Sequence, residues 1–175
     1  MADLKLPPHG GSKHGINPLF LRDEELRQAM ELLFFAYRDF TAGPDAILAQ
    51  YGFGRAHHRA IHFIGRHPGM TVSELLGILR ITKQSLNRVL GQLVDQGYVE
   101  QRQGTRDRRQ RLLTLTEAGR ALEERVSAEQ RALIATAYRE AGAEAVEGFR
   151  KVLLGIIGTE EDRRRFERPA GIPRR

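Results

Sequence analysis

The side chains with the clearest chemical potential lie between residues 82 and 109, and they form two groups. One group occupies the outer face of an expected short helix and consists of Thr82, Lys83, Gln84, Ser85, Asn87 and Arg88. The other occupies a short loop and consists of Arg106, Asp107, Arg108 and Arg109. Amide, hydroxyl and basic side chains can read the edges of DNA bases, and guanidinium groups pair with phosphates. Together the two groups indicate DNA binding.

Two short helices joined by a tight turn are expected to position the first group. Thr71-Val72-Ser73-Glu74 matches a capping box, so one helix begins there. Arg80-Ile81 forms the turn, Thr82 caps the second helix, and Gly97 ends it in a left-handed conformation. The pattern predicts a helix-turn-helix. The apolar residues that its second helix buries are Leu86, Val89, Leu90 and Leu93.

A β-hairpin is expected to present the second group. Residues 99–103 and 111–115 are short segments with β-branched or alternating apolar residues, which is typical of paired strands. Arginines on one exposed loop repel one another unless an anion lies between them, and a DNA backbone or a narrow minor groove supplies that anion. We expect Asp107 to pair with the guanidinium of Arg109 and to orient it. Most of the formal net charge of +6 falls between residues 82 and 111.

Several stretches follow one another in a familiar order. They include Thr71–Leu76, Ile81–Leu90 and Leu93–Val99, and the most specific are Asp107-Arg108-Arg109 and Leu115-Thr116-Glu117-Ala118-Gly119. The last two are similar to a D-R-R wing and to an L-T-x-x-G motif that precedes the next helix. From about Phe53 to Glu124 the chain therefore resembles the multiple antibiotic resistance regulator (MarR) family of bacterial transcription factors.

The resemblance implies a fold class and a domain organisation. The fold is expected to be mainly α with a small β-hairpin wing. A winged helix-turn-helix at about 53–116 is flanked by dimerisation helices at about 23–50 and 117–157, which together make a MarR-like domain at 19–158. We expect a flexible arm at 1–18 and a basic, loosely ordered tail at 159–175.

Glycine and proline positions indicate where these helices begin and end. An apolar seam from Asp23 to Thr41 predicts a helix that Gly43-Pro44 interrupts, and Gly142 separates the last two amphipathic helices. These helices carry more apolar surface than the small winged unit of one chain covers. The resemblance implies that they interdigitate between two copies.

A homodimer of this kind is expected to act as a transcriptional regulator, and family habit favours a repressor. Two recognition helices related by twofold symmetry would read a palindromic operator with half-sites about 34 Å apart. The resemblance implies an aromatic small-molecule effector that releases DNA by changing that spacing. Phe34, Tyr37 and Phe40 are candidates to line its crevice, with plain core packing as the alternative for each.

Composition restricts the remaining classes. The 175 residues are 41% hydrophobic and 29% charged, as in ordinary globular domains. No apolar stretch approaches the roughly 18 residues of a membrane span, and no signal peptide is evident, so we expect a cytoplasmic protein. Cysteine is absent, which excludes oxidant sensing through a thiol. No cofactor motif or catalytic constellation is present, so we expect no enzyme activity and no cofactor.

Two alternatives stay open at the level of sequence. His58 and His62 have the i, i+4 spacing at which two imidazoles can share a zinc ion, although two further ligands are not evident. The chain would then be a metal-responsive regulator. The other alternative is a winged helix used only for protein contacts, which would not need the arginine-rich loop.

Overall fold

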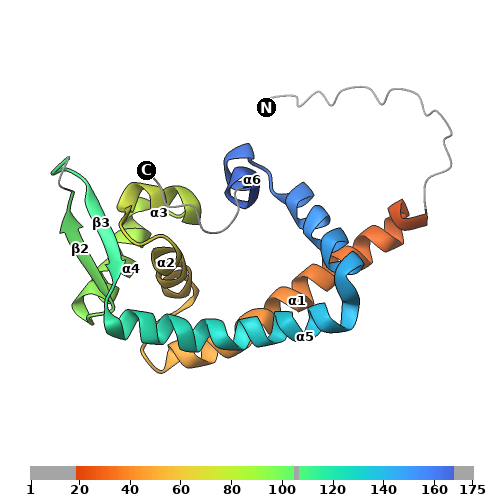
Figure 1. Ribbon diagram of the computed structural model, residues 1–175, viewed down its shortest axis with the longest axis horizontal. Helices are drawn as coiled ribbons and strands as arrows, with labels where there is room; N and C mark the ends of the chain where they lie inside the picture. The colour runs from red at the N-terminus through yellow and green to blue at the C-terminus, as the bar shows by residue number, and fades with distance from the viewer. Residues whose placement is uncertain (1–18, 105–106, 168–175) are drawn as a thin grey trace, which may run out of the picture. The chain divides into compact units, whose positions relative to one another are not determined.

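The computed structural model describes residues 19–104 and 107–167, and the predicted arm at 1–18 lies outside them. The chain divides between Arg38 and Asp39 into two compact units. The elements, drawn in Figure 1, are η1 (Leu19–Leu21), α1 (Asp23–Ala49), α2 (Arg55–Arg66), β1 (Met70–Thr71), α3 (Val72–Leu79), α4 (Lys83–Asp95), β2 (Val99–Gln103), β3 (Arg111–Leu115), α5 (Glu117–Ile156) and α6 (Glu160–Glu167). This mainly helical chain with one small sheet confirms the predicted fold class.

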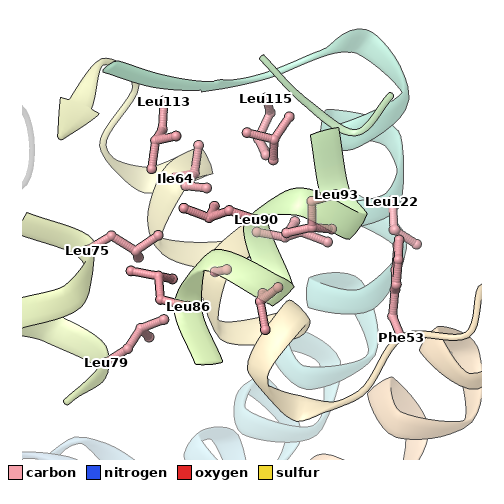
Figure 2. Close-up of a cluster of buried hydrophobic side chains, with 14 of the residues drawn as sticks. Phe53, Ile64, Leu75, Leu79, Leu86, Leu90, Leu93, Leu113, Leu115 and Leu122 are labelled. Carbon is pink, nitrogen blue, oxygen red and sulfur yellow. The ribbon is translucent and has the colours of Figure 1, made fainter. Parts of the chain in front are cut away.

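The core of the second unit is built from leucine faces that come together from several elements. Figure 2 shows Leu75 and Leu79 of α3 beside Leu86 of α4, with Ile64 of α2 and Leu113 of β3 nearby. Burying one such side chain contributes about 1.5 to 3 kcal/mol. All four residues predicted for the inner face of α4 are buried. The opposite face of α4 is therefore turned outward.

The hairpin has the strand limits that the sequence predicts, but the sheet has a third strand. Strands β2 and β3 pair antiparallel with Val99 opposite Leu115 and Gln103 opposite Arg111. Met70 and Thr71 form β1, which pairs with the other edge of β3, so the order is β1-β3-β2. Two residues are too few to leave a period-two pattern, which is why the sequence did not predict β1.

The predicted helix starts are confirmed at hydrogen-bond level. Thr71 Oγ1 accepts from the N–H of Glu74 at 3.1 Å, and the Glu74 carboxylate accepts from the N–H of Thr71 at 2.7 Å. Thr82 Oγ1 accepts from the N–H of Ser85 at 3.1 Å. Gly97 follows α4 with φ of 75°, as predicted. These caps fix where α3 and α4 begin and thus where their polar faces point.

Thr116 and Gly119 join α5 to the winged unit. The Thr116 hydroxyl donates to the carbonyl of Gly97 at 2.6 Å and accepts from the N–H of Gly119 at 3.0 Å. A Cβ at Gly119 would collide with the carbonyl oxygen of Tyr98. A side-chain hydroxyl at position 116 and a glycine at position 119 thus both fit this junction, which gives the Leu-Thr-x-x-Gly spacing a physical reason.

The expected interruption at Gly43-Pro44 is wrong, because α1 continues to Ala49 with Pro44 inside it. Proline lacks the N–H that would bond the carbonyl of Phe40 one turn earlier. In the structure, the side-chain amide of Gln130 on α5 donates to that carbonyl at 3.1 Å. A tertiary contact supplies the missing donor, and sequence periodicity could not reveal it.

The C-terminal half of the chain agrees with one prediction and departs from another. Gly142 breaks α5 with φ of 79° and ψ of 166°, as expected, and the chain continues as helix to Ile156. Residues 160–167 form α6, so the expectation of a loosely ordered tail is wrong for them. Residues 168–175 lie outside the described part. Within the residues described, no helix is both long and apolar enough to cross a bilayer.

The contact between Gln130 and Phe40 gives a stability prediction. Gln130→Leu should lower the free energy of unfolding by about 1 to 3 kcal/mol, because it leaves the Phe40 carbonyl without a donor. Urea denaturation followed by circular dichroism measures the change. In a Pro44→Ala background the restored N–H can bond the Phe40 carbonyl, so Gln130→Leu should lower the free energy of unfolding less there. Equal losses in both backgrounds would contradict the role of Gln130 as the donor to that carbonyl.

Candidate nucleic-acid interface

The outer face of α4 carries the first group of predicted residues. Lys83, Gln84, Asn87 and Arg88 are exposed on it. Thr82 and Ser85 stand at its start, where the Thr82 hydroxyl donates to Ser85 Oγ at 2.8 Å besides capping the helix. The N–H groups of the first turn point along the helix axis beyond its start. Such an end can face a DNA groove or a phosphate.

The wing carries the second group, and its loop is held by main-chain bonds. The N–H of Gln110 donates to the carbonyl of Asp107, and the N–H of Gly104 donates to the carbonyl of Gln110, both at 3.0 Å. Arg108 and Arg109 are exposed beyond this turn. Arg106 lies outside the described residues. Two guanidinium groups therefore project from a turn with a defined backbone.

The predicted pairing of Asp107 with the Arg109 guanidinium is wrong. The Asp107 carboxylate instead accepts from the backbone N–H of Arg109 at 2.9 Å. A short acidic side chain two residues before its N–H donor closes an Asx-type turn. Asp107 thus shapes the loop, and it directs Arg109 through the main chain rather than through an ion pair.

A groove of about 500 Å³ lies between α4 and the wing. Asn87 of α4 lines one side, Gln101 and Arg111 of the strands line the other with Arg109, and Ser73 closes it from the start of α3. Guanidinium, amide and hydroxyl groups that converge in this way match the donors that bind a phosphodiester. The groove thus combines one residue of each predicted group with three side chains that the sequence did not single out.

Ser73, Gln101 and Arg111 were missed for a common reason. Each belongs to a different element, and only the packing of α3 and α4 against the hairpin brings them together. For Arg111 there was one weak indication in the sequence, which is its contribution to the positive charge of residues 82–111. The strand register that places Gln101 opposite Leu113 was not deducible from pattern alone.

Gln92 of α4 shares the polar side of this helix but has a structural partner. His57 Nε2 and Gln92 Oε1 are 2.6 Å apart, which joins α2 to α4. The other ring nitrogen of His57 accepts from the N–H of Gly54 at 3.1 Å, so Nε2 carries the hydrogen donated to Gln92. The ring also stacks on Phe53, with centroids 4.8 Å apart. His57 therefore ties α2 to the middle of α4.

The two histidines of the zinc hypothesis lie in different surroundings. His62 Nδ1 contacts the Glu123 carboxylate at 3.3 Å, and that carboxylate also accepts from the Ser127 hydroxyl. Burial lowers the pKa of the half-buried His58, and nearby His62 lowers it further. Among residues 19–104 and 107–167, no three His, Asp or Glu side chains are grouped to hold a metal ion.

The three aromatic residues proposed to line an effector crevice do not share one described site. Phe34 and Tyr37 belong to the N-terminal unit, where both side chains are exposed. Phe40 belongs to the second unit and lines a cavity of about 210 Å³ between α1 and α5. Asp39 and Glu129 contribute acidic side chains to the same lining. The effector role of all three residues stays a prediction.

Comparison with known proteins agrees with this geometry. The model of the MarR family matches residues 51–110. The HTH-type transcriptional regulator PetP of Rhodobacter capsulatus is 58% identical over 147 residues, which are 84% of this chain and 89% of that protein. FabT of Streptococcus pneumoniae, solved in complex with DNA, superposes with a TM-score of 0.66 at 21% identity, over 78% of this chain and 98% of FabT. A MarR-family protein of Mycobacterium tuberculosis in complex with p-aminosalicylic acid gives 0.51 at 27% identity, over 71% and 94%.

The lowered pKa of His58 predicts acid sensitivity. The folded protein keeps this imidazole neutral at a pH where the unfolded chain, with a histidine pKa of about 6.5, already binds a proton. Stability should therefore fall as the pH drops below about 6.5. His58→Gln, which cannot titrate, should flatten that dependence, measured by urea denaturation at about pH 7.5 and about pH 5.5. A slope identical to that of the unsubstituted protein would contradict the prediction.

Proposed function

This protein belongs to the MarR family of transcriptional regulators, and from that premise we propose that it is a repressor that binds a palindromic operator as a homodimer. One observation carries the proposal. Asn87 of the exposed face of α4 and Arg109 and Arg111 of the hairpin border a single groove that also contains Gln101 and Ser73. A base-reading face and a phosphate-binding face thus adjoin on one side of the winged unit.

Each element has a distinct part in the proposed complex. The first turns of α4 enter the major groove, where Gln84, Asn87 and Arg88 face base edges and Lys83 faces the backbone. Arg108 and Arg109 reach the neighbouring minor groove or its phosphates from the wing. Arg111 and Ser73 hold the phosphodiester that passes between helix and hairpin. Thr82, Ser85 and Asp107 keep helix and loop in the shapes that these contacts need.

The dimer is supported by apolar surface in each unit taken separately. In the N-terminal unit, Leu26, Met30 and Leu33 are exposed along α1. In the second unit, Phe149 and Ile156 are exposed on the last part of α5. Contiguous apolar surface of this kind marks an interface, and a second copy of the chain supplies matching surface by symmetry.

A small-molecule effector remains part of the proposal. The cavity beside Phe40 is the supporting feature, since it lies where α1 meets α5 and where a ligand would change how these helices pack. Its acidic residues Asp39 and Glu129 favour an aromatic cation over an aromatic acid. A lower affinity for the operator on adding an aromatic cation would support release by an effector. Identical affinity with and without the compound would refute the proposed effector.

The proposed dimer has a direct test in sedimentation equilibrium. At micromolar concentration the protein should have twice the 19.8 kDa mass of one chain. Phe149→Glu should shift it toward the single-chain mass, because a carboxylate is costly to bury in an apolar interface. Circular dichroism controls for loss of helix. A wild-type protein that sediments as one chain would refute the homodimer.

Two substitutions separate backbone binding from base reading. Arg109→Ala should weaken binding to every duplex and reduce the slope of log affinity against log salt by about 1. The operator sequence is first found by selection from random duplexes. Gln84→Ala should weaken binding to that operator by about 1 to 3 kcal/mol, and it should weaken binding to random DNA much less. Fluorescence anisotropy measures both effects.

Arg131→Ala is the matched control, because it removes the same charge from α5, where Arg131 pairs with Glu124. It should leave the affinity unchanged. If Arg109→Ala behaved like this control, the wing would not be a DNA contact. If no duplex bound at low salt, the chain would instead be a winged protein-interaction module.

A further inference from the structure

Helix α6 contacts the turn of the helix-turn-helix through one arginine. Arg80 Nη2 donates to Thr159 Oγ1 and to Asp162 Oδ2, each at 3.1 Å. These acceptors form the N-terminal cap of α6, where the Thr159 hydroxyl also donates to Asp162 Oδ2 at 2.7 Å. Residues about eighty positions apart in the sequence are thereby joined.

Arg80 occupies a special place in the turn. It ends α3 in the left-handed conformation, with φ of 49° and ψ of 41°, and its N–H donates to the carbonyl of Leu76. Among the described residues it alone has positive φ without being glycine. Such a conformation is strained for an arginine and fixes the direction in which its side chain leaves the turn.

The same position is suited to a DNA phosphate. In a helix-turn-helix the first helix crosses the DNA backbone while the second enters the major groove, so the turn between them lies beside phosphates. Arg80 stands two residues before the Thr82 cap of α4. Its side chain is 61% exposed even with Asp162 bound. A guanidinium there can reach a phosphate oxygen.

Resting on the proposed DNA-binding function, we propose that Arg80 is a backbone contact for which α6 and DNA compete, with the Asp162 carboxylate in the place of a phosphate. Carboxylate and phosphate are alternative acceptors for the same guanidinium fork. DNA must then break the contact with Asp162 before it gains Arg80. The protein therefore binds DNA less tightly than it would without the contact between Arg80 and Asp162.

Two other carboxylates at the start of α6 are engaged within the helix. Glu160 pairs with Arg164 at 3.3 Å, and Glu161 pairs with Arg165 at 3.2 Å. Asp162 also contacts Arg165, at 3.3 Å, but alone among the three it reaches Arg80. The hydrogen bond from Thr159 lowers the pKa of Asp162, with further lowering by Arg165 and Arg80, so the competing group stays ionised near neutral pH.

Helix α6 is also tied to the end of α5. The Arg150 guanidinium of α5 donates to the carbonyl of Phe166 at 3.2 Å, and Arg163 Nε donates to the carbonyl of Ile157 at 2.8 Å. Only residues 157–159 separate α5 from α6. A movement of the last part of α5 would therefore carry Asp162 toward or away from Arg80. The competition thus gives that region a route to control DNA affinity.

A pair of charge-matched variants of the full-length protein tests the competition. Asp162→Asn and Glu161→Gln each remove one carboxylate from the same turn and one of the two carboxylate contacts of Arg165, but only the first removes the carboxylate that Arg80 contacts. Anisotropy with a random duplex should show a two- to fivefold gain in affinity, about what an exposed ion pair is worth, for Asp162→Asn. Glu161→Gln should bind like the unsubstituted protein.

Arg80→Ala completes the cycle. It should weaken binding and lower the salt slope by about 1, and it should abolish the gain from Asp162→Asn when the two are combined. A gain that persists without Arg80 would mean that Asp162 acts through the stability of α6, and the proposal would fall. Equal affinities for the two carboxylate variants, or no effect of Arg80→Ala, would also overturn it.

The test distinguishes this proposal from the function on which it rests. If the unsubstituted protein bound no duplex even at low salt, both would be lost. If it bound a duplex and the variants did not differ from it, only the competition at Arg80 would be lost.

Discussion

The burial of the leucine face of α4 is the constraint on which the rest of the interface depends. Leu86, Val89, Leu90 and Leu93 pack into the core that α2, α3 and β3 form around them. Because these side chains are spaced at helical intervals, their burial fixes the rotation of α4 about its axis. Lys83, Gln84, Asn87 and Arg88 are exposed as a consequence. The outward direction of these polar side chains is thus set by apolar contacts on the opposite side of the helix.

Polar contacts then fix the position of this helix along its axis and its attachment to the neighbours. The Thr82 cap sets the first residue, and the bond between His57 and Gln92 ties the middle of α4 to α2. The Thr116 hydroxyl links the end of the winged unit to α5. A few defined bonds thus join α4 and the winged unit to α2 and α5.

The arginines of the winged unit differ in whether an acidic side chain lies beside them. Arg109 and Arg111 border the groove without an acidic residue in its lining, whereas Arg102 is paired with Glu100 on the strand. Arg80 lies between these cases, because its partner belongs to another element. Its contact with Asp162 joins α6 to the turn between α3 and α4, and we propose that DNA competes for this contact.

Local pattern was sufficient for much of this protein. The capping residues Thr71, Thr82 and Thr116, the limits of both hairpin strands and the buried face of α4 all follow from interactions within a few residues, which a sequence displays directly. Tertiary structure decided the rest. Pro44 lies inside α1, where Gln130 of α5 donates to the Phe40 carbonyl, and Ser73, Gln101 and Arg111 meet only when three elements pack. Each of these depends on the distance between groups that the chain separates, and periodicity carries no information about such distances.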